Sequence, residues 1–354
     1  MDLPCWNSSA MCTLNGAPAC NTTLVGHPEG YTMIFSPTET TILGISAVLL
    51  ALLGAMANGL LIGSLLLAPR IRALSTSPFI ISLCTSDLLF SIYVLPILAA
   101  RFLNREEQGK EEEVMCQSWP VILFTLVLST ALIFVLSSVH RAGCLFFREK
   151  VEQIFSNHIN IVLVLVCWII CLVSISSVQS YGKVIRWGYT QDCQIVHMKY
   201  PKPGPNPMNP LLLVYFSILF LVLLISNAAM MIKIKMETNI NYESRKEHMF
   251  IFMMLTAFLA WTFSHLPYIL VTRLDPCLKH TSLHAVAYIL NWLKVVTNPI
   301  IFIFMDHGFK KAVYNLASRT TRCASEKSRP NFVTVPSFEL EAQKSVRYNK
   351  GNTS

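Results

Sequence analysis

Charged residues are scarce in this chain of 354 residues. They make up 14% of it, whereas soluble domains usually carry about a quarter. Hydrophobic residues make up 53%, and the mean hydropathy is +0.50. No Lys or Arg occurs before Arg70, and no charged residue of either sign lies between Trp119 and Val139. The composition therefore favours a membrane protein over a soluble domain.

The sequence also lacks the patterns of several other protein classes. It contains no pairing of a nucleophile with a base and no cluster of metal ligands, so we expect neither an enzyme nor a bound cofactor or metal. The net charge of +8 comes from basic residues scattered through short loops, which argues against nucleic-acid binding. No internal repeat of the transporter type is visible. The N-terminus has no signal-peptide pattern, so the first apolar span is expected to target the chain itself.

Long apolar runs are what the chain does contain. The stretch from Cys116 to Arg141 is long enough, at about 1.5 Å per residue, to cross a hydrocarbon core about 30 Å thick. Similar runs elsewhere predict that the chain crosses the membrane seven times, as an all-α protein with a seven-transmembrane helix bundle. The other predicted spans cover 42–68, 78–100, 158–179, 210–232, 248–272 and 282–305.

The basic residues indicate the orientation. Arg70 and Arg72 follow the first span at once, which by the positive-inside rule places the N-terminus outside the cell and the C-terminus inside. We therefore expect a multi-pass protein of the plasma membrane. The expected parts are an extracellular glycosylated tail (1–40), the bundle (41–305), a short amphipathic helix on the membrane surface (306–322) and a disordered cytoplasmic tail (323–354).

Several residues outside the spans are candidates for modification. Sequons predict glycosylation of Asn7 and Asn21 on the outer tail. Cys323, at the end of the amphipathic helix, is a candidate for palmitoylation. The chain has 11 cysteines, and the sequence alone does not fix which of the outer ones pair. The predicted outer cysteines are Cys5, Cys12, Cys20, Cys116, Cys193 and Cys277.

Seven single motifs occur in order, each in its own span or in the adjoining helix. Together they resemble the rhodopsin-like (class A) G-protein-coupled receptors over nearly the whole chain. Spans five to seven are similar in texture to the melatonin and medium-chain fatty-acid receptors. The motif residues are Asn58, Asp87 at the end of Ser82-Leu83-Cys84-Thr85-Ser86-Asp87, Cys116 placed 25 residues before Arg141, Trp168, Pro267, Asn298-Pro299 and Phe309.

The resemblance implies a receptor that passes an extracellular ligand signal to a heterotrimeric G protein, with arrestin as a further partner. The signal would travel through movement of the cytoplasmic ends of spans three, five and six. The resemblance pairs Cys116 with Cys193 in a disulfide. It assigns the switch to Arg141, with Glu247 as its oppositely charged partner in the resting state. Asn298 and Pro299 would complete that switch.

Several positions depart from the family pattern. His140 and Ala142 flank Arg141 where the family usually has an acid and a tyrosine, and His265 replaces a tryptophan. Asn227 and Phe302 stand where two tyrosines normally help to hold the active state. A non-signalling or scavenger-type receptor is therefore an alternative.

A buried polar core is expected between the spans. A carboxylate such as Asp87 is costly in the middle of a membrane and needs partners, and Thr130 and Asn298 would supply polar groups beside it. Asn58 is a further member expected in this core. Many members of the family bind sodium beside this aspartate. Lys294, one turn before Asn298, is expected to reach Asp87 and take the ion's place.

The same lysine raises a second alternative, a photoreceptor with retinal bound to Lys294. The retinal lysine of the family would fall at Trp292. Two residues along a helix correspond to about 200° of rotation, so Lys294 is expected to point away from a retinal pocket.

The ligand is left open by the sequence. Leu123, Phe124 and Val127 lie where an amine receptor presents an aspartate, which disfavours amines. Cations of the outer half suit an acidic amphipath, lipid or peptide, with ordinary solvated loop charges as the alternative. These cations are Arg101, Lys183, Arg186 and Arg273. The pocket candidates are Leu123, Phe124, Val127, His265, Tyr268, Trp292, Arg186 and Arg273; membrane lipid would surround the spans.

Overall fold

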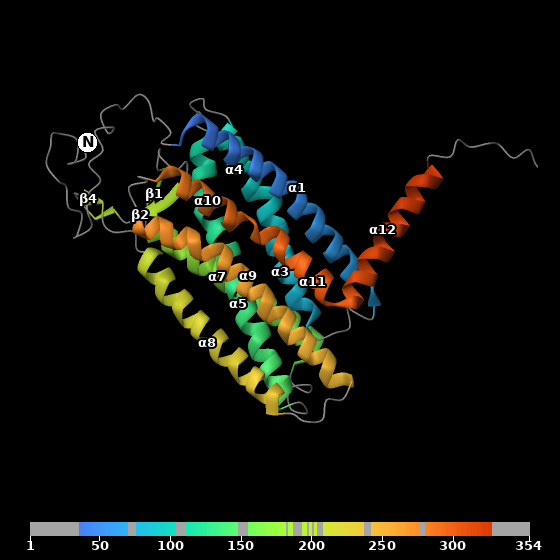
Figure 1. Ribbon diagram of the computed structural model, residues 1–354. Helices are drawn as coiled ribbons and strands as arrows, with labels where there is room; N and C mark the ends of the chain where they lie inside the picture. The colour runs from blue at the N-terminus through green and yellow to red at the C-terminus, as the bar shows by residue number, and fades with distance from the viewer. Residues whose placement is uncertain are drawn as a thin grey trace, which may run out of the picture. The chain divides into compact units, whose positions relative to one another are not determined.

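The computed structural model describes residues 35–69, 76–103, 111–147, 155–181, 183–186, 193–196, 198–199, 202–203, 208–236, 242–275 and 280–327. From residue 37 to residue 305 the helices pack side by side as a bundle, with α5 in contact with α3, α7, α8 and α9 (Figure 1). We name the end of the bundle that contains Arg141 the inner end, and the end that contains the N-terminus of α1 the outer end. The helices are α1 (Pro37–Leu67), α3 (Ser77–Leu89), α4 (Leu95–Leu103), α5 (Glu111–Phe146), α7 (Asn157–Tyr181), α8 (Met208–Met236), α9 (Tyr242–Leu274), α10 (Thr281–Trp292), α11 (Lys294–Met305) and α12 (His307–Lys327).

These helices account for all seven predicted spans. Six spans are long and apolar enough to cross a membrane, with α3 and α4 forming one span and α10 and α11 another. Within α8, the stretch Ser217–Lys233 is a shorter apolar segment. The whole of α8 has 29 residues, which at 1.5 Å per residue is about 43 Å and is also sufficient.

Some predicted boundaries were wrong. The second span was predicted to end at residue 100, but α4 continues to Leu103, and α5 begins at Glu111, before the predicted third span. The amphipathic helix α12 continues to Lys327, five residues beyond the predicted boundary at 322. The long outer loop holds two short antiparallel ladders that were not predicted. Strand β1 (Lys183–Arg186) pairs with β2 (Cys193–Val196), and β3 (Met198–Lys199) pairs with β4 (Lys202–Pro203).

Helix α1 begins with a capping box. The Ser36 hydroxyl accepts a hydrogen bond from the Glu39 backbone N–H, and the Glu39 carboxylate accepts one from the Ser36 N–H. Pro37 occupies the first turn, where its missing N–H costs nothing. The sequence thereby fixes the outer end of α1.

The second span contains a π turn, η1 (Phe90–Val94), between α3 and α4. The Leu95 N–H donates to the Phe90 carbonyl five residues back, one residue further than in an α-helix. Pro96 follows and has no N–H to donate. The wider turn accommodates this proline without ending the span.

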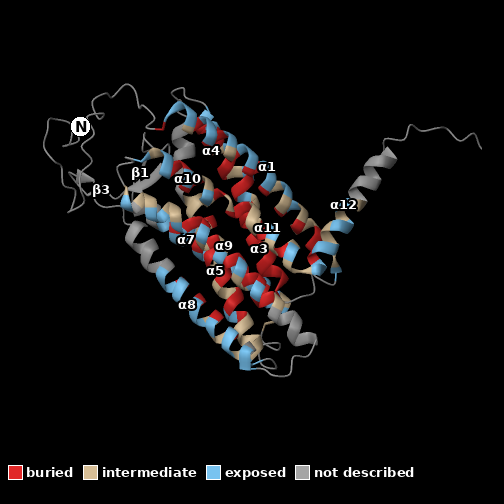
Figure 2. Ribbon diagram, viewed as in Figure 1, coloured by how far each residue is buried: buried red, intermediate tan, exposed pale blue. Residues whose placement is uncertain are grey.

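Buried apolar side chains fill the bundle in two large clusters, and exposed ones face outward (Figure 2). The inner cluster includes Phe134, Met253 and Phe302, and the outer cluster includes Phe102, Tyr288 and Trp292. Leu52 and Ile169 are more than half exposed. Such outward apolar residues are what a lipid environment requires.

Helix α1 approaches its neighbours most closely at Gly54. A Cβ atom there would collide with the Ser91 hydroxyl and lie 2.7 Å from Val295 Cγ2. One turn further on, the Asn58 Nδ2 donates to the carbonyls of Gly54 and Val295 at 2.9 and 2.7 Å. Gly54 and Asn58 therefore join α1 to α11.

Candidate functional site

A polar core lies in the middle of the bundle and connects α3 with α11. Asp87 is 2% exposed, and its Oδ2 accepts a hydrogen bond from the Asn298 Nδ2 at 2.7 Å. On α5 the Thr130 hydroxyl donates to the Leu126 carbonyl and lies 2.9 Å from the Ser86 hydroxyl of α3. Buried polar groups of this kind bind their helices together because leaving them unpaired is costly.

Lys294, at the start of α11, points into the same core. It is 3% exposed, its Nζ lies 3.3 Å from the His265 Nε2 of α9, and it sits 4.2 Å from the centre of the Phe90 ring. An ammonium can only donate, so the His265 Nε2 must accept. The His265 Nδ1 then carries the proton and donates to the Trp261 carbonyl at 3.0 Å. His265 is therefore neutral in this arrangement.

This geometry differs from the expectation that Lys294 reaches Asp87. Among the described residues, the hydrogen bond of the ammonium goes to His265, and no direct ion pair joins Lys294 to Asp87. Phe90 is only three residues beyond Asp87 on the same span, so the two charges still attract each other. The ammonium instead links α9 to α11.

The contacts of Trp292 and Lys294 agree with the helical rotation expected between these two residues. The chain forms a turn at Leu293 between α10 and α11, and the Val296 N–H donates to the Leu293 carbonyl three residues back. Leu293 itself keeps right-handed helical dihedral angles, φ −56° and ψ −22°, so the rotation across it stays close to that of a helix. Trp292 packs against Phe102 and Tyr288, while Lys294 lies against Phe90 and His265.

At the inner end, Arg141 faces α9. Its guanidinium carbon lies 3.8 Å from the centre of the Phe250 ring. Arg141 also lines a small pocket between α5, α8 and α9, together with Ser138, Asn227 and Met254. The Asn227 Nδ2 donates to a carbonyl of its own helix, that of Leu223.

His140 is turned away from this pocket. It is buried, its Nε2 lies 3.4 Å from the Asn160 Nδ2 of α7, and its ring contacts Phe79 of α3 and Phe155. The residue before Arg141 therefore packs α5 against α3 and α7. Phe302, another departure, is also fully buried and contacts the ring of Phe309.

Arg101 is not a solvated loop charge. It lies in α4, is 3% exposed, and its guanidinium carbon is 4.8 Å from the centre of the Trp119 ring on α5. For this cation, the alternative of an ordinary exposed charge is excluded. The side chains of Lys183, Arg186 and Arg273 lie outside the described residues.

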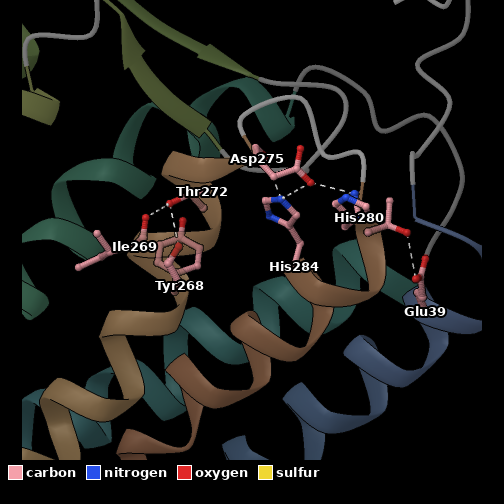
Figure 3. A network of polar contacts seen from close by, with 8 residues as sticks. Glu39, Tyr268, Ile269, Thr272, Asp275, His280 and His284 are labelled. Carbon is pink, nitrogen blue, oxygen red and sulfur yellow. Dashed lines mark hydrogen bonds and ion pairs between the residues drawn. The ribbon is translucent and has the colours of Figure 1, made fainter.

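Polar contacts close the outer end of the bundle (Figure 3). Glu39 of α1 accepts hydrogen bonds from the Thr281 and Ser282 hydroxyls at the start of α10, at 3.0 and 2.6 Å. Asp275, just after α9, accepts from the His280 N–H at 2.8 Å, and its Oδ2 lies 3.5 Å from the His284 Nε2. These contacts join α1, α9 and α10.

The ligand-pocket candidates do not form one group. Leu123 and Tyr268 pack against the outer cluster that includes Trp292, and Val127 packs against the inner cluster. Phe124 contacts a separate small cluster with Cys171 on α7. Leu123, Tyr268 and Trp292 therefore lie together, whereas Phe124 lies on another side of α5.

Some predicted site residues cannot be placed. Asn7 and Asn21 lie outside the described residues. Glu247 in α9 and Cys323 in α12 belong to described helices, but their side chains are not described. The same holds for Cys116 and Cys193, although β2, which begins at Cys193, lies beside α5. The disulfide stays a prediction. Among the described residues, four cysteines of the spans take part in no disulfide: Cys84, Cys144, Cys167 and Cys171.

A bundle of seven spans around a buried polar core is the architecture of helical membrane receptors. The family model of the seven-transmembrane receptors (rhodopsin family) matches residues 57–302, well over half of the chain. The chain belongs to this family. It is therefore a multi-pass membrane protein of a family whose members are receptors and not enzymes.

Individual relatives are more distant. "Protein trapped in endoderm-1" of Drosophila melanogaster is 25% identical over 316 residues, which cover 80% of this chain and 79% of that protein. "G-protein coupled receptor moody" is 21% identical in Drosophila pseudoobscura pseudoobscura and 22% identical in Drosophila melanogaster, over 78% of this chain in both cases. The chain spans about half the length of the moody receptors, 52% and 51%.

Sequence reasoning missed several residues of the site. Phe250 and Trp261 carry no signal beyond that of ordinary apolar core residues. Glu39, Asp275 and His284 could have been found as polar residues next to predicted helix ends, where caps are expected.

Proposed function

We propose that this protein is a plasma-membrane receptor that passes an extracellular signal to a heterotrimeric G protein, with the N-terminus outside and the C-terminus inside. The observation that supports this most directly is the pocket at the inner end, where α5, α8 and α9 meet around Arg141. A G protein would bind there when the inner ends of these helices separate. Arrestin would use the same surface.

The polar core supplies the connection between the two ends. Lys294 and His265 join α11 to α9, and Asn298 and Asp87 join α11 to α3. Pro267 lies inside α9, two residues beyond His265, and weakens the helix locally. A ligand that shifts α9 or α11 at the outer end would therefore change contacts near the hinge of α9.

The ligand we propose is an acidic amphipath. Arg101 supports this choice, because a buried guanidinium over an aromatic ring at the outer end suits a carboxylate or phosphate better than an amine. We expect laurate, but not dodecylamine, to stabilise the purified receptor. The stabilisation by laurate should be lost in the Arg101→Gln variant. Equal effects of both compounds would contradict it.

The coupling is tested by nucleotide exchange on a panel of purified heterotrimers, with the receptor in nanodiscs. Basal exchange is expected on at least one heterotrimer, higher with Glu247→Ala and lost with Arg141→Ala. A matched control is Lys233→Ala in α8, which does not line the pocket. Absence of exchange with both the wild type and Glu247→Ala would contradict coupling.

A second candidate function is a scavenger-type receptor without signalling. The observation that favours it is the burial of His140 and Phe302. These two residues depart from the family's signalling motifs, and both pack between helices. Constitutive internalisation of the receptor without nucleotide exchange on any heterotrimer would support this candidate.

A further inference from the structure

We infer that the ring of Phe250 positions Arg141 in the resting receptor, so that a cation–π contact holds α5 and α9 together at the inner end. The inference rests on the proposed function and deepens it by naming an aromatic restraint on the arginine. Such a restraint is distinct from the ion pair with Glu247 that the sequence suggests.

The contact has the geometry and surroundings that make a cation–π interaction strong. The guanidinium carbon lies 3.8 Å from the ring centre, well within the limit of about 6 Å for this interaction. Phe250 is 6% exposed and belongs to the inner apolar cluster, so its ring cannot turn into solvent without opening the core. Exclusion of water strengthens the attraction between the cation and the ring face.

The described residues around the pocket add no acidic side chain beside the ring. His140, the residue before Arg141, is buried against α3 and α7 and supplies no negative charge on the pocket side. The described residues that line the pocket beside Arg141 include Ser137, Ser138 and Met254, and none of them is acidic. The electron-rich face of Phe250 is therefore one group on α9 that attracts the guanidinium.

Separation of the inner ends of α5 and α9 would have to break this contact. Loss of a desolvated cation–π interaction would shift the equilibrium between the resting and the active receptor toward the active state by about tenfold to thirtyfold. When the active state is a minor population, basal activity rises by the same factor.

The test replaces Phe250 by phenylalanines with one, two and three ring fluorines, introduced by nonsense suppression in the full-length receptor. Fluorine withdraws electrons from the ring face with little change of size. Three fluorines together should remove the cation–π attraction, so each should contribute one third of the total effect on a logarithmic scale. Basal nucleotide exchange is therefore expected to rise by about threefold with each fluorine. The same series at Phe263 is the control, since this ring on the same helix is 71% exposed and does not line the pocket.

A second readout does not depend on the G protein. Hydrogen exchange of the backbone amides around Phe250 is expected to accelerate in the same steps, and the steps should vanish in the Arg141→Gln background. The series should persist in Glu247→Gln if the ring acts in addition to the acid. Graded hydrogen exchange without nucleotide exchange would support the contact and overturn the proposed coupling. A flat series in both readouts would overturn the contact and leave the coupling in place.

Discussion

The two ends of the bundle are built in different ways. At the outer end, carboxylates meet helix ends directly: Glu39 binds the first residues of α10, and Asp275 binds His280 and His284. Rings of Phe35, Phe102 and Tyr288 pack edge to face beneath them.

The inner end is less closed. Helices α5, α8 and α9 surround a pocket, and among the described residues the Ser137 and Ser138 hydroxyls beside it have no hydrogen-bond partner. Arg141 contacts α9 through the face of the Phe250 ring. The outer end is therefore fixed by directional bonds, whereas the inner end can rearrange at lower cost. The four predictions below test this difference, beginning with the core that both ends share.

The largest effect is expected for Asp87→Asn. This change removes the nearest described carboxylate from the buried ammonium of Lys294 and should lower the stability of the receptor by about 3 kcal/mol. Thermal unfolding in nanodiscs measures it. The double variant Asp87→Asn/Lys294→Met is the control and should recover most of the loss. A single variant as stable as the wild type would show that the two charges are not coupled.

Gly54→Ala should destabilise the contact between α1 and α11. The added Cβ would collide with the Ser91 hydroxyl and with Val295, for a loss of about 2 kcal/mol. Gly59→Ala on the same helix is the matched control, because its Cβ would have nothing within 4 Å. If the unfolding temperature falls equally in both variants, the close approach at Gly54 is not the cause of the lost stability.

Lys294→Asn should create a response to sodium. In the wild type, the Lys294 ammonium lies near enough to Asp87 for the two charges to interact, so it disfavours a second cation at Asp87 by Coulomb repulsion. The wild type should unfold at the same temperature in sodium chloride and in N-methylglucamine chloride. The variant should gain about 1.5 kcal/mol when sodium exceeds its dissociation constant about tenfold. An Asp87-dependent response of the wild type to millimolar sodium would refute this.

The smallest effect is expected for Glu39→Ala at the outer end. Loss of the bonds to Thr281 and Ser282 should cost about 1 kcal/mol in thermal unfolding. Glu39→Gln keeps an acceptor and should lie between the variant and the wild type. Basal nucleotide exchange should not change, because the inner end is untouched. A rise in exchange would mean that the two ends are not independent.

The sequence predicted the parts of the fold that depend on hydropathy. Apolar runs located the spans, and polar residues inside them, Asn58, Asp87 and Lys294, are buried in the structure. Helix ends were less accurate, because helical hydrogen bonding continues into charged segments such as the start of α5.

Partner choice was less predictable than burial. Lys294 was expected near Asp87, but the position of His265 directs its ammonium to α9. Phe250 could not be distinguished from any other buried aromatic residue, since its role depends on which side chain lies on its face. Arg101 was counted among outer cations because its position near a span end does not reveal burial.

The π turn in the second span affects how other sequences should be aligned with this one. It holds one residue more than an α-helical turn would. A relative with a regular helix in this span can be aligned with this chain without a gap only up to Phe90. Beyond Phe90, the relative's sequence needs a gap of one residue. Without that gap, every later residue of the span would be assigned a direction wrong by about 100°. Arg101 would then be assigned the direction that Phe102 has, and the cation over Trp119 would be missed.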